Sequence, residues 1–175
     1  QVDLLSGEIL GAEALIRWRD PELGDVTPAE FIPVAERSGF IVALGAWVLH
    51  QAVHQAALWR DKGYRLVMSV NVSALQFQQP DFVQSVAQVL QEVGLEPQCL
   101  ELELTESILI QDAQEALERL QGLAQLGVKL AIDDFGTGYS SLAYLKRFPI
   151  SRLKIDRSFV KGLPGDESDA GIVHA

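Results

Sequence analysis

Two adjacent aspartates, Asp133 and Asp134, end the apolar run VKLAI and are followed by the glycine-rich stretch FGTGYSSL. Like charges at the end of a buried strand repel each other, and some must protonate unless a cation neutralises them. Adjacent aspartates can flank two divalent cations about 3.5–4 Å apart, which is the spacing of two-metal phosphoryl chemistry. The pair therefore indicates a metal site that other residues of the chain complete.

Polar residues recur where other apolar runs end. They are Glu13 in GAEAL, Asn71 in SVNVS, Glu103 and Glu106 in LELTES, and Lys154 in RLKID. Carboxylate and amide oxygens are the ligands that Mg²⁺ and Mn²⁺ prefer. Taken singly, each residue has an ordinary explanation. The alternation of Glu101 and Glu103 with leucines is typical of a half-exposed strand, and Lys154 is typical of a surface lysine. Their recurrence at five strand ends favours one shared site.

The stretch after Asp134 has two interpretations. Gly136 and Gly138 can permit a tight turn. Alternatively, they belong to a mobile loop that closes over the site, with Ser140 or Ser141 hydrogen-bonded by an acid such as Glu106. The aspartates themselves could also cap a turn and the following helix.

The elements that must position these residues alternate along the chain. We predict strands at 2–5, 8–18, 66–72, 99–104, 128–133 and 151–156, and helices at 27–39, 43–63, 81–94, 112–127 and 140–148. The first two strands form a hairpin through the turn at Ser6 and Gly7. Later strands pair in parallel through helical crossovers, which leaves an open doubly wound sheet or a TIM-type barrel. No GxGxxG follows the first strand, which argues against a dinucleotide fold.

Composition narrows the function classes. The 175 residues are 48% hydrophobic, which suffices for one domain core, and the net charge of −10 argues against binding a nucleic-acid polymer. Cys99 stands alone, so an internal disulfide and a cysteine-rich zinc site are excluded. No stretch approaches the roughly 20 apolar residues of a membrane span, so no membrane contact is expected from this segment. Because the chain lacks an initiator Met, we expect it to be a piece of something longer.

Five segments carry a family resemblance. EALIRW (13–18), SVNVS (69–73), ELTES (103–107), DDFGTGYSSL (133–142) and LKIDRSF (153–159) together resemble the EAL family of cyclic di-GMP phosphodiesterases. The resemblance implies a TIM-like barrel whose first strand is antiparallel to the rest, truncated here to about six of eight strands. Residues 1–175 would then be an EAL domain that is incomplete at both ends. The later strands that carry a further glutamate ligand and a glutamine near the nucleophilic water are missing.

The resemblance also implies an activity and its ligands. The reaction is hydrolysis of cyclic di-GMP to linear pGpG by two Mg²⁺ or Mn²⁺ ions that activate water. Glu13, Asn71, Glu103 and Asp133 would hold one ion, and Asp134 would reach the second. By the same resemblance, Lys154, Asp134 and Glu13 are the catalytic residues.

Further roles follow from the same resemblance. Arg17, four residues past Glu13 on the same strand face, would contact a substrate phosphate, and Leu15 would touch the substrate through its backbone. Asp134 would contact the substrate as well. Glu106 and Ser140 would stabilise the 136–141 loop, which in the family helps to form a dimer face.

The resemblance also implies a ligand and an oligomeric state, and it leaves an alternative function open. The resemblance implies cyclic di-GMP as ligand, a homodimer of the full domain, upstream GGDEF or sensory domains as an option, and a cytoplasmic location. Attachment of the parent protein to a membrane through other segments stays open. The alternative function is a non-catalytic EAL-type receptor for cyclic di-GMP, or a protein-interaction module.

Overall fold

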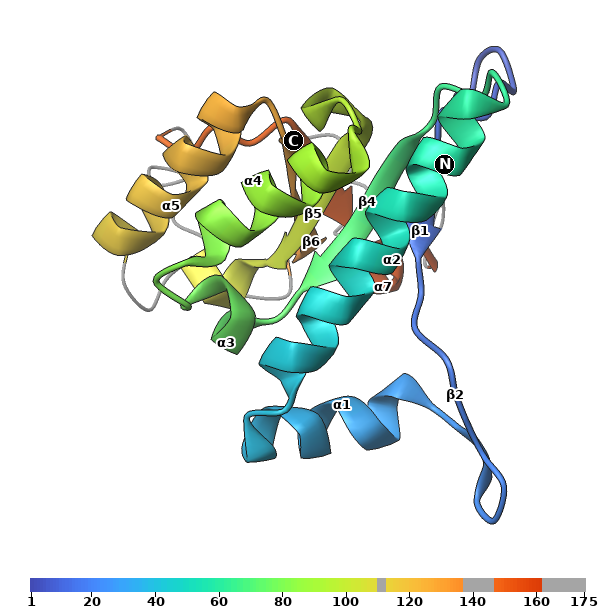
Figure 1. Cartoon of the computed structure of the whole chain (residues 1–175), viewed down its shortest axis with the longest axis vertical. Helices are drawn as coiled ribbons and strands as arrows, with labels where there is room; N and C mark the ends of the chain where they lie inside the picture. The colour runs from blue at the N-terminus through green and yellow to red at the C-terminus, as the bar shows by residue number, and fades with distance from the viewer. Residues whose placement is uncertain (110–112, 137–146, 162–175) are drawn as a thin grey trace.

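The centre of the molecule is a five-stranded parallel sheet (Figure 1). The computed structural model describes residues 1–109, 113–136 and 147–161. The sheet has the order β1-β4-β5-β6-β7, and its strands are β1 Gly11–Ala14, β4 Val67–Val72, β5 Leu100–Thr105, β6 Lys129–Phe135 and β7 Arg152–Ile155. Each neighbouring pair is parallel, so the strands point their carboxyl ends to one edge.

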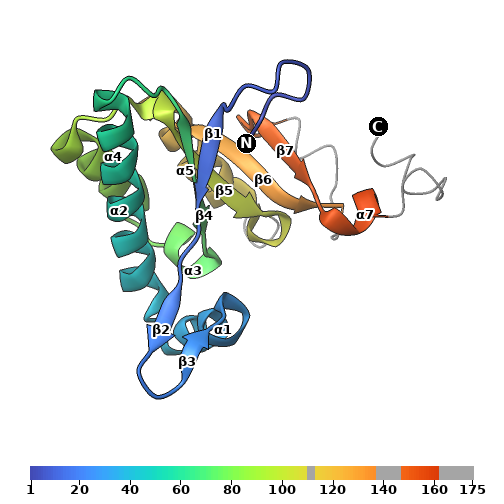
Figure 2. The same ribbon diagram turned by 90° about the vertical axis from the view of Figure 1, so that its right-hand side faces the viewer.

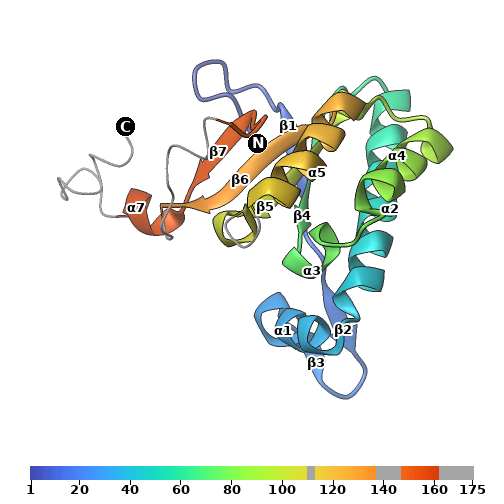
Figure 3. The ribbon, with the colours of Figure 1, turned by 90° about the vertical axis from the view of Figure 1, so that its left-hand side faces the viewer.

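Helices α2, α4 and α5 cover one face of this sheet, and α1 lies beyond its end (Figure 3). The long helices are α1 Pro28–Ser38, α2 Ile41–Asp61, α4 Phe82–Val93 and α5 Ala113–Leu126. They confirm the helices predicted at 27–39, 43–63, 81–94 and 112–127 to within about two residues. Thr27 and Glu30 form a capping box, in which the Thr27 backbone N–H donates to a Glu30 carboxylate oxygen at 2.8 Å.

Short helical pieces were not predicted. They are α3 Ala74–Phe77, η1 Pro97–Cys99, η2 Glu106–Leu109 and α7 Arg157–Lys161. A segment of three to five residues offers too little periodicity to be recognised. The helix predicted at 140–148 lies mainly outside the described residues, and Ser140 with it.

The core lies between the sheet and the helices. Leu100, Leu102 and Leu104 on β5 are fully buried and belong to the same apolar cluster as Leu120 of α5. Side chains alternate between the two faces of a strand, so the glutamates between these leucines point to the opposite face. This division places apolar contacts on the helical side and leaves polar chemistry for the other side.

Strand predictions succeeded for the later strands and failed at the start. The strands predicted at 66–72, 99–104, 128–133 and 151–156 are confirmed within two residues. The strand predicted at 2–5 is wrong. It reduces to a single antiparallel bridge between Val2 and Ile9, because the Asp3 carboxylate accepts hydrogen bonds from the backbone N–H groups of Leu5 and Ser6 and turns the chain.

The strand predicted at 8–18 is also too long. Regular pairing stops at Ala14, and the chain then enters a separate antiparallel hairpin of β2 Trp18–Asp20 and β3 Gly24–Val26. Consequently the described sheet holds five strands rather than six. All of them are parallel, so the predicted antiparallel first strand survives only as the Val2–Ile9 bridge.

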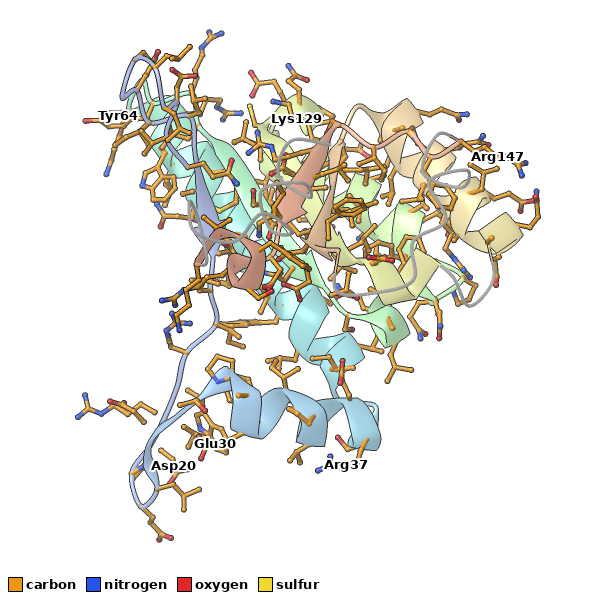
Figure 4. The ribbon with its side chains drawn as sticks, turned by 180° about the vertical axis from the view of Figure 1, so that it is seen from behind. Asp20, Glu30, Arg37, Tyr64, Lys129 and Arg147 are labelled. Atoms are coloured by element: carbon orange, nitrogen blue, oxygen red, sulfur yellow. The ribbon has the colours of Figure 1, made fainter. Side chains whose placement is uncertain are left out.

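The β2–β3 hairpin and α1 form a lobe at one end of the molecule (Figure 2). Trp18 fixes the hairpin to α1 through an edge-on contact with Phe31, with 5.8 Å between ring centroids. Figure 4 shows Asp20 and Glu30 on this lobe, and Tyr64 and Lys129 at the opposite end. Since Lys129 begins β6, the lobe stands at the end where the strands terminate.

Helix α2 corrects the prediction that no stretch approaches a membrane span. Among the described residues it is the one helix long and apolar enough to span a membrane by length and composition, with a mean hydropathy of 1.3. The core helix of a globular domain meets the same criteria. Leu49, Val53 and Ala57 of α2 are buried in the core cluster, whereas Trp47 and Leu58 of the same helix are exposed.

We predict that Leu120→Ala lowers the free energy of unfolding by about 2–5 kcal/mol, because Leu120 is fully buried between helix and sheet. Urea denaturation followed by circular dichroism measures this change. Leu4→Ala is the matched control, since Leu4 is 97% exposed, and it should alter stability by less than about 0.5 kcal/mol. Equal effects of the two substitutions would contradict the placement of the core.

Candidate active site

The carboxyl ends of the strands bring distant polar residues together. Asn71 of β4 is aligned with Glu103 of β5, and β1 places Glu13 beside β4. The Asn71 side-chain amide donates to a Glu13 carboxylate oxygen at 2.8 Å. Asp133, near the end of β6, is aligned with Thr105 of β5. We call Glu13, Asn71, Glu103, Asp133 and Lys154 the acid cluster.

Lys154 lies at the centre of the acid cluster. Its Nζ donates to Glu103 at 2.6 Å and to Asp133 at 2.9 Å, and lies 3.8 Å from Glu13. Lys154 was open to interpretation as a surface lysine, and that interpretation is wrong, because its side chain is only 26% exposed. A single cation therefore holds three carboxylates that would otherwise repel.

Titration behaviour follows from this packing. Burial acts to lower the pKa of the Lys154 ammonium, but its hydrogen bonds to Glu103 and Asp133 outweigh burial and raise that pKa. Burial raises the pKa of the Glu103 carboxyl, an effect that Lys154 opposes and that Glu13 and Asp133 reinforce. The Lys154 ammonium thus stays charged. A further positive charge nearby would stabilise the ionised form of Glu103.

The cluster fits a divalent cation by residue type and by charge. Three carboxylates and one ammonium leave a net charge of −2. The Glu103 Oε1 atom is buried and accepts no hydrogen bond from any described residue, which is the state of a ligand atom that lacks its partner. In the part of the chain that the structure describes, no group of three acids is arranged to hold a metal as it stands, and the Lys154 ammonium lies between Glu103 and Asp133.

The two adjacent aspartates lie at an irregularity in the sheet. Ile132 pairs with Leu153 and Phe135 with Ile155, so β6 carries one more residue than β7 over this interval. Asp134 has a φ of 54°, in the left-handed region that non-glycine residues rarely adopt. This bulge interrupts the normal alternation of side chains at the pair.

Asp134 lies beside the cluster rather than in it. Burial raises the pKa of its carboxyl, Asp133 and Asp156 raise it further, and Lys154 opposes them. Two acids and one lysine thus lie near the Asp134 carboxyl. Strained backbone at such a position is a feature that clusters at functional sites.

Arg17 and Leu15 lie beside the acid cluster but not on its strand. The prediction that Arg17 shares a strand face with Glu13 is wrong, because β1 ends at Ala14 and Arg17 donates to the Ile16 carbonyl at 2.8 Å. Both residues nevertheless line a cavity of about 290 Å³ that Asn71 and Glu103 also line. We call this the inner cavity. Arg17 and two cluster residues thus line the same recess.

Glu106 is buried directly after β5. It is 5% exposed, and neither of its carboxylate oxygens accepts a hydrogen bond from a described residue. Its predicted partner Ser140 and the glycine Gly138 lie outside the described residues. The loop-stabilising role of Glu106 and Ser140 accordingly stays a prediction.

A second polar layer lies below the acid cluster, and sequence reasoning missed it. Glu101 was predicted to be half-exposed, but it is fully buried. Ser69 donates to Glu101 at 2.8 Å, and the Arg152 Nε lies 3.3 Å from the other Glu101 oxygen. The sequence did contain a signal for this layer. Glu101 and Glu103 are two residues apart on one strand, and Arg152 and Lys154 are two residues apart on another. Two acids on β5 thus face two bases on β7.

A larger cavity of about 700 Å³ lies in the lobe. Trp18, Phe31 and Trp47 line it, together with Arg17 and Glu30, but no residue of the acid cluster does. Its walls are mainly apolar side chains. Arg17 lines both this cavity and the inner cavity, whereas Asn71 and Glu103 line only the inner one of the two.

Comparison with known proteins agrees with this arrangement. The family model described as EAL domain matches residues 1–175. The bifunctional diguanylate cyclase/cyclic di-GMP phosphodiesterase MucR of Pseudomonas aeruginosa is 50% identical over 171 residues, which are 97% of this chain and 25% of that protein. The cyclic di-GMP phosphodiesterase PdeR of Escherichia coli is 46% identical over 169 residues, 97% of this chain and 26% of that protein. The chain thus spans about a quarter of the length of these curated relatives.

A solved structure shows the same fold. The structure described as PaMucR phosphodiesterase in complex with c-di-GMP matches with a TM-score of 0.91 and 50% identity, covering 95% of this chain and 68% of that chain. The parallel strands, the acids at their ends and these matches lead to one conclusion: the chain belongs to the EAL domain family.

Proposed function

We propose that this chain is the acid-bearing part of a domain that hydrolyses one phosphodiester bond of cyclic di-GMP to give linear pGpG. The observation that carries the proposal is the convergence of Glu13, Glu103 and Asp133 on one cation, Lys154 Nζ, at the shared strand edge. The names of the relatives MucR and PdeR support the same reaction.

The metal ligands follow from the acid cluster. Glu13, Asn71, Glu103 and Asp133 would hold one Mg²⁺ or Mn²⁺ ion, and Asp134, displaced by the bulge, would reach a second. When bound, such a pair of cations lowers the pKa of a water molecule and stabilises the negative charge that develops on a phosphodiester. The buried, unpaired Glu103 Oε1 supports this ligand set.

The remaining residues would bind and orient. The Lys154 ammonium donates hydrogen bonds and keeps its proton, which suits it to hold a water molecule and to offset charge at the cluster. The Arg17 guanidinium, with its fork of donors, would bind a phosphate oxygen pair. Leu15, in the same segment, would contact the substrate through its backbone. Glu106 would hold the 136–141 loop through Ser140.

The setting of the domain is also proposed. The five parallel strands with helices on one face support closure of the complete domain as a TIM-like (β/α) barrel, of which residues 1–175 are a part. We further propose a cytoplasmic location, where cyclic di-GMP would be met, and a homodimer of the complete domain with GGDEF or sensory domains upstream. Sedimentation of the complete domain measures the dimer directly.

We predict that Glu13→Ala abolishes hydrolysis of cyclic di-GMP in the presence of Mn²⁺, reducing the rate by about 100-fold or more, because a metal ligand is lost. Chromatographic separation of cyclic di-GMP and pGpG measures the rate in the complete domain. Glu8→Ala is the matched control, since Glu8 is exposed and outside the cluster. Tight binding of cyclic di-GMP without turnover by the wild-type domain would favour the receptor alternative instead.

We predict that Lys154→Met makes the metal-free protein less stable and more responsive to metal. Without the ammonium, three carboxylates lose their counter-charge, so added Mn²⁺ should raise the melting temperature more in the variant than in the wild type. Thermal denaturation with EDTA or Mn²⁺ measures both shifts. Lys129→Met provides the control, because Lys129 lies at the opposite end of β6 (Figure 4). Identical Mn²⁺ shifts in wild type and Lys154→Met would refute a metal site at the cluster.

A further inference from the structure

Arg152 is the positive partner of a carboxylate that the sheet buries completely. Glu101 is fully buried, and the Ser69 hydroxyl donates to its Oε1 atom at 2.8 Å. The Oε2 atom of Glu101 accepts no hydrogen bond from any described residue, and it lies 3.3 Å from the Arg152 Nε. A buried carboxylate charge is costly unless an opposite charge accompanies it. Among the described residues, Arg152 is the one cationic side chain that forms an ion pair with Glu101.

A second cation lies on the same face of β7. Side chains alternate in direction along a strand, so Arg152 and Lys154 point the same way, about 6–7 Å apart along β7. Glu101 and Glu103 repeat this spacing on β5. On the intervening β6, Ala131 contributes only a methyl group, which leaves the long side chains free to cross. Lys154 therefore has two acids within one two-residue step of β7, namely Glu103, which it contacts, and Glu101.

Lys129 is the other cation to consider. It is aligned with Glu101 across β5 and β6, yet the two form no ion pair in the part of the chain that the structure describes. Burial raises the pKa of the Cys99 thiol, and the nearby Lys129 charge opposes that effect. Lys129 thus lies toward the start of β5, whereas Lys154 already points between two buried or half-buried acids of the sheet. Lys154 is accordingly the cation that Glu101 would attract if Arg152 were absent.

We propose that Arg152 is a positioning residue, which keeps Lys154 at the acid cluster by neutralising Glu101. With Arg152 in place, Glu101 has its counter-charge, and Lys154 stays where the proposed reaction needs a donor to hold water. Without Arg152, Glu101 competes with Glu103 for one lysine. Glu103 lines the inner cavity, whereas the described residues Glu101 and Arg152 do not, so their effect passes through Lys154. This assignment rests on the proposed function and adds to it a control on the place of the lysine.

A crystal structure of the complete domain with Arg152→Met, grown in EDTA, tests the position of Lys154 directly. Methionine keeps the length of the arginine stem and removes its charge. We expect the Lys154 Nζ within about 3.5 Å of the Glu101 carboxylate and away from the cluster. In the matched control Arg65→Met, which alters an exposed arginine, Lys154 should stay at the cluster. A Lys154 that stays there in Arg152→Met, or Lys129 paired with Glu101 in its place, overturns the assignment.

The kinetics of the complete domain test the consequence. Arg152→Met should lower kcat for cyclic di-GMP by about 10- to 100-fold with little change in KM, because the lysine leaves the reacting water while the inner cavity is unaltered. Adding Glu101→Gln should restore kcat, since the acid that attracts Lys154 is then uncharged. In a Lys154→Met background, Arg152→Met should lower kcat no further.

Two results would show that Arg152 acts only through general stability. They are a double variant Glu101→Gln/Arg152→Met as slow as Arg152→Met, and a further loss of kcat in the Lys154→Met background. The double variant removes the buried charge, so it keeps the test available if Arg152→Met alone does not fold. If the wild-type domain does not hydrolyse cyclic di-GMP, the proposed function fails. The place of Lys154 in the crystal structures then decides the Arg152 assignment, because it requires neither metal nor substrate.

Discussion

Repulsion between carboxylates at one edge of a parallel sheet is the constraint on which this structure depends. Parallel pairing forces Glu13, Glu103 and Asp133 to the same edge, and in water-poor surroundings three such charges cannot remain together unopposed. Lys154 provides the opposing charge from β7, at 2.6 Å from Glu103 and 2.9 Å from Asp133. The last strand of the described sheet therefore does more than extend the core. It supplies the cation that allows the acids of the other strands to approach.

The polar layer below the acid cluster is also held together by an acid paired with a base. Glu101 and Arg152 repeat, two residues earlier on β5 and β7, the pairing of Glu103 with Lys154. The side chain of Ala131, on the intervening β6, is small and fully buried, which lets the long side chains meet across it. Two stacked acid–base pairs thus tie β5 to β7 across one strand. The Glu101–Arg152 pair therefore helps to fix the position of Lys154, although it lies below the acid cluster.

Much of this arrangement could be predicted from the sequence. Strong period-two and helical patterns located the later strands and the four long helices, and polar residues at strand ends identified Glu13, Asn71, Glu103 and Asp133. The N-terminal strands were wrong because Asp3 forms local hydrogen bonds that propensity does not reveal. Burial of Glu101 was missed because alternation along one strand cannot tell a solvated face from the inside of a curved sheet.

The extra residue in β6 has a consequence for how this region can change over evolution. From Ile132 to Phe135 the chain of β6 advances three residues, while the paired part of β7 advances two. The position of Asp134 therefore depends on the number of residues in β6 as well as on their types. Deleting one residue would restore regular pairing and turn one of the two aspartates toward the helices. An insertion or deletion here would thus change the direction of one of the two carboxylates while both aspartates stayed in the sequence.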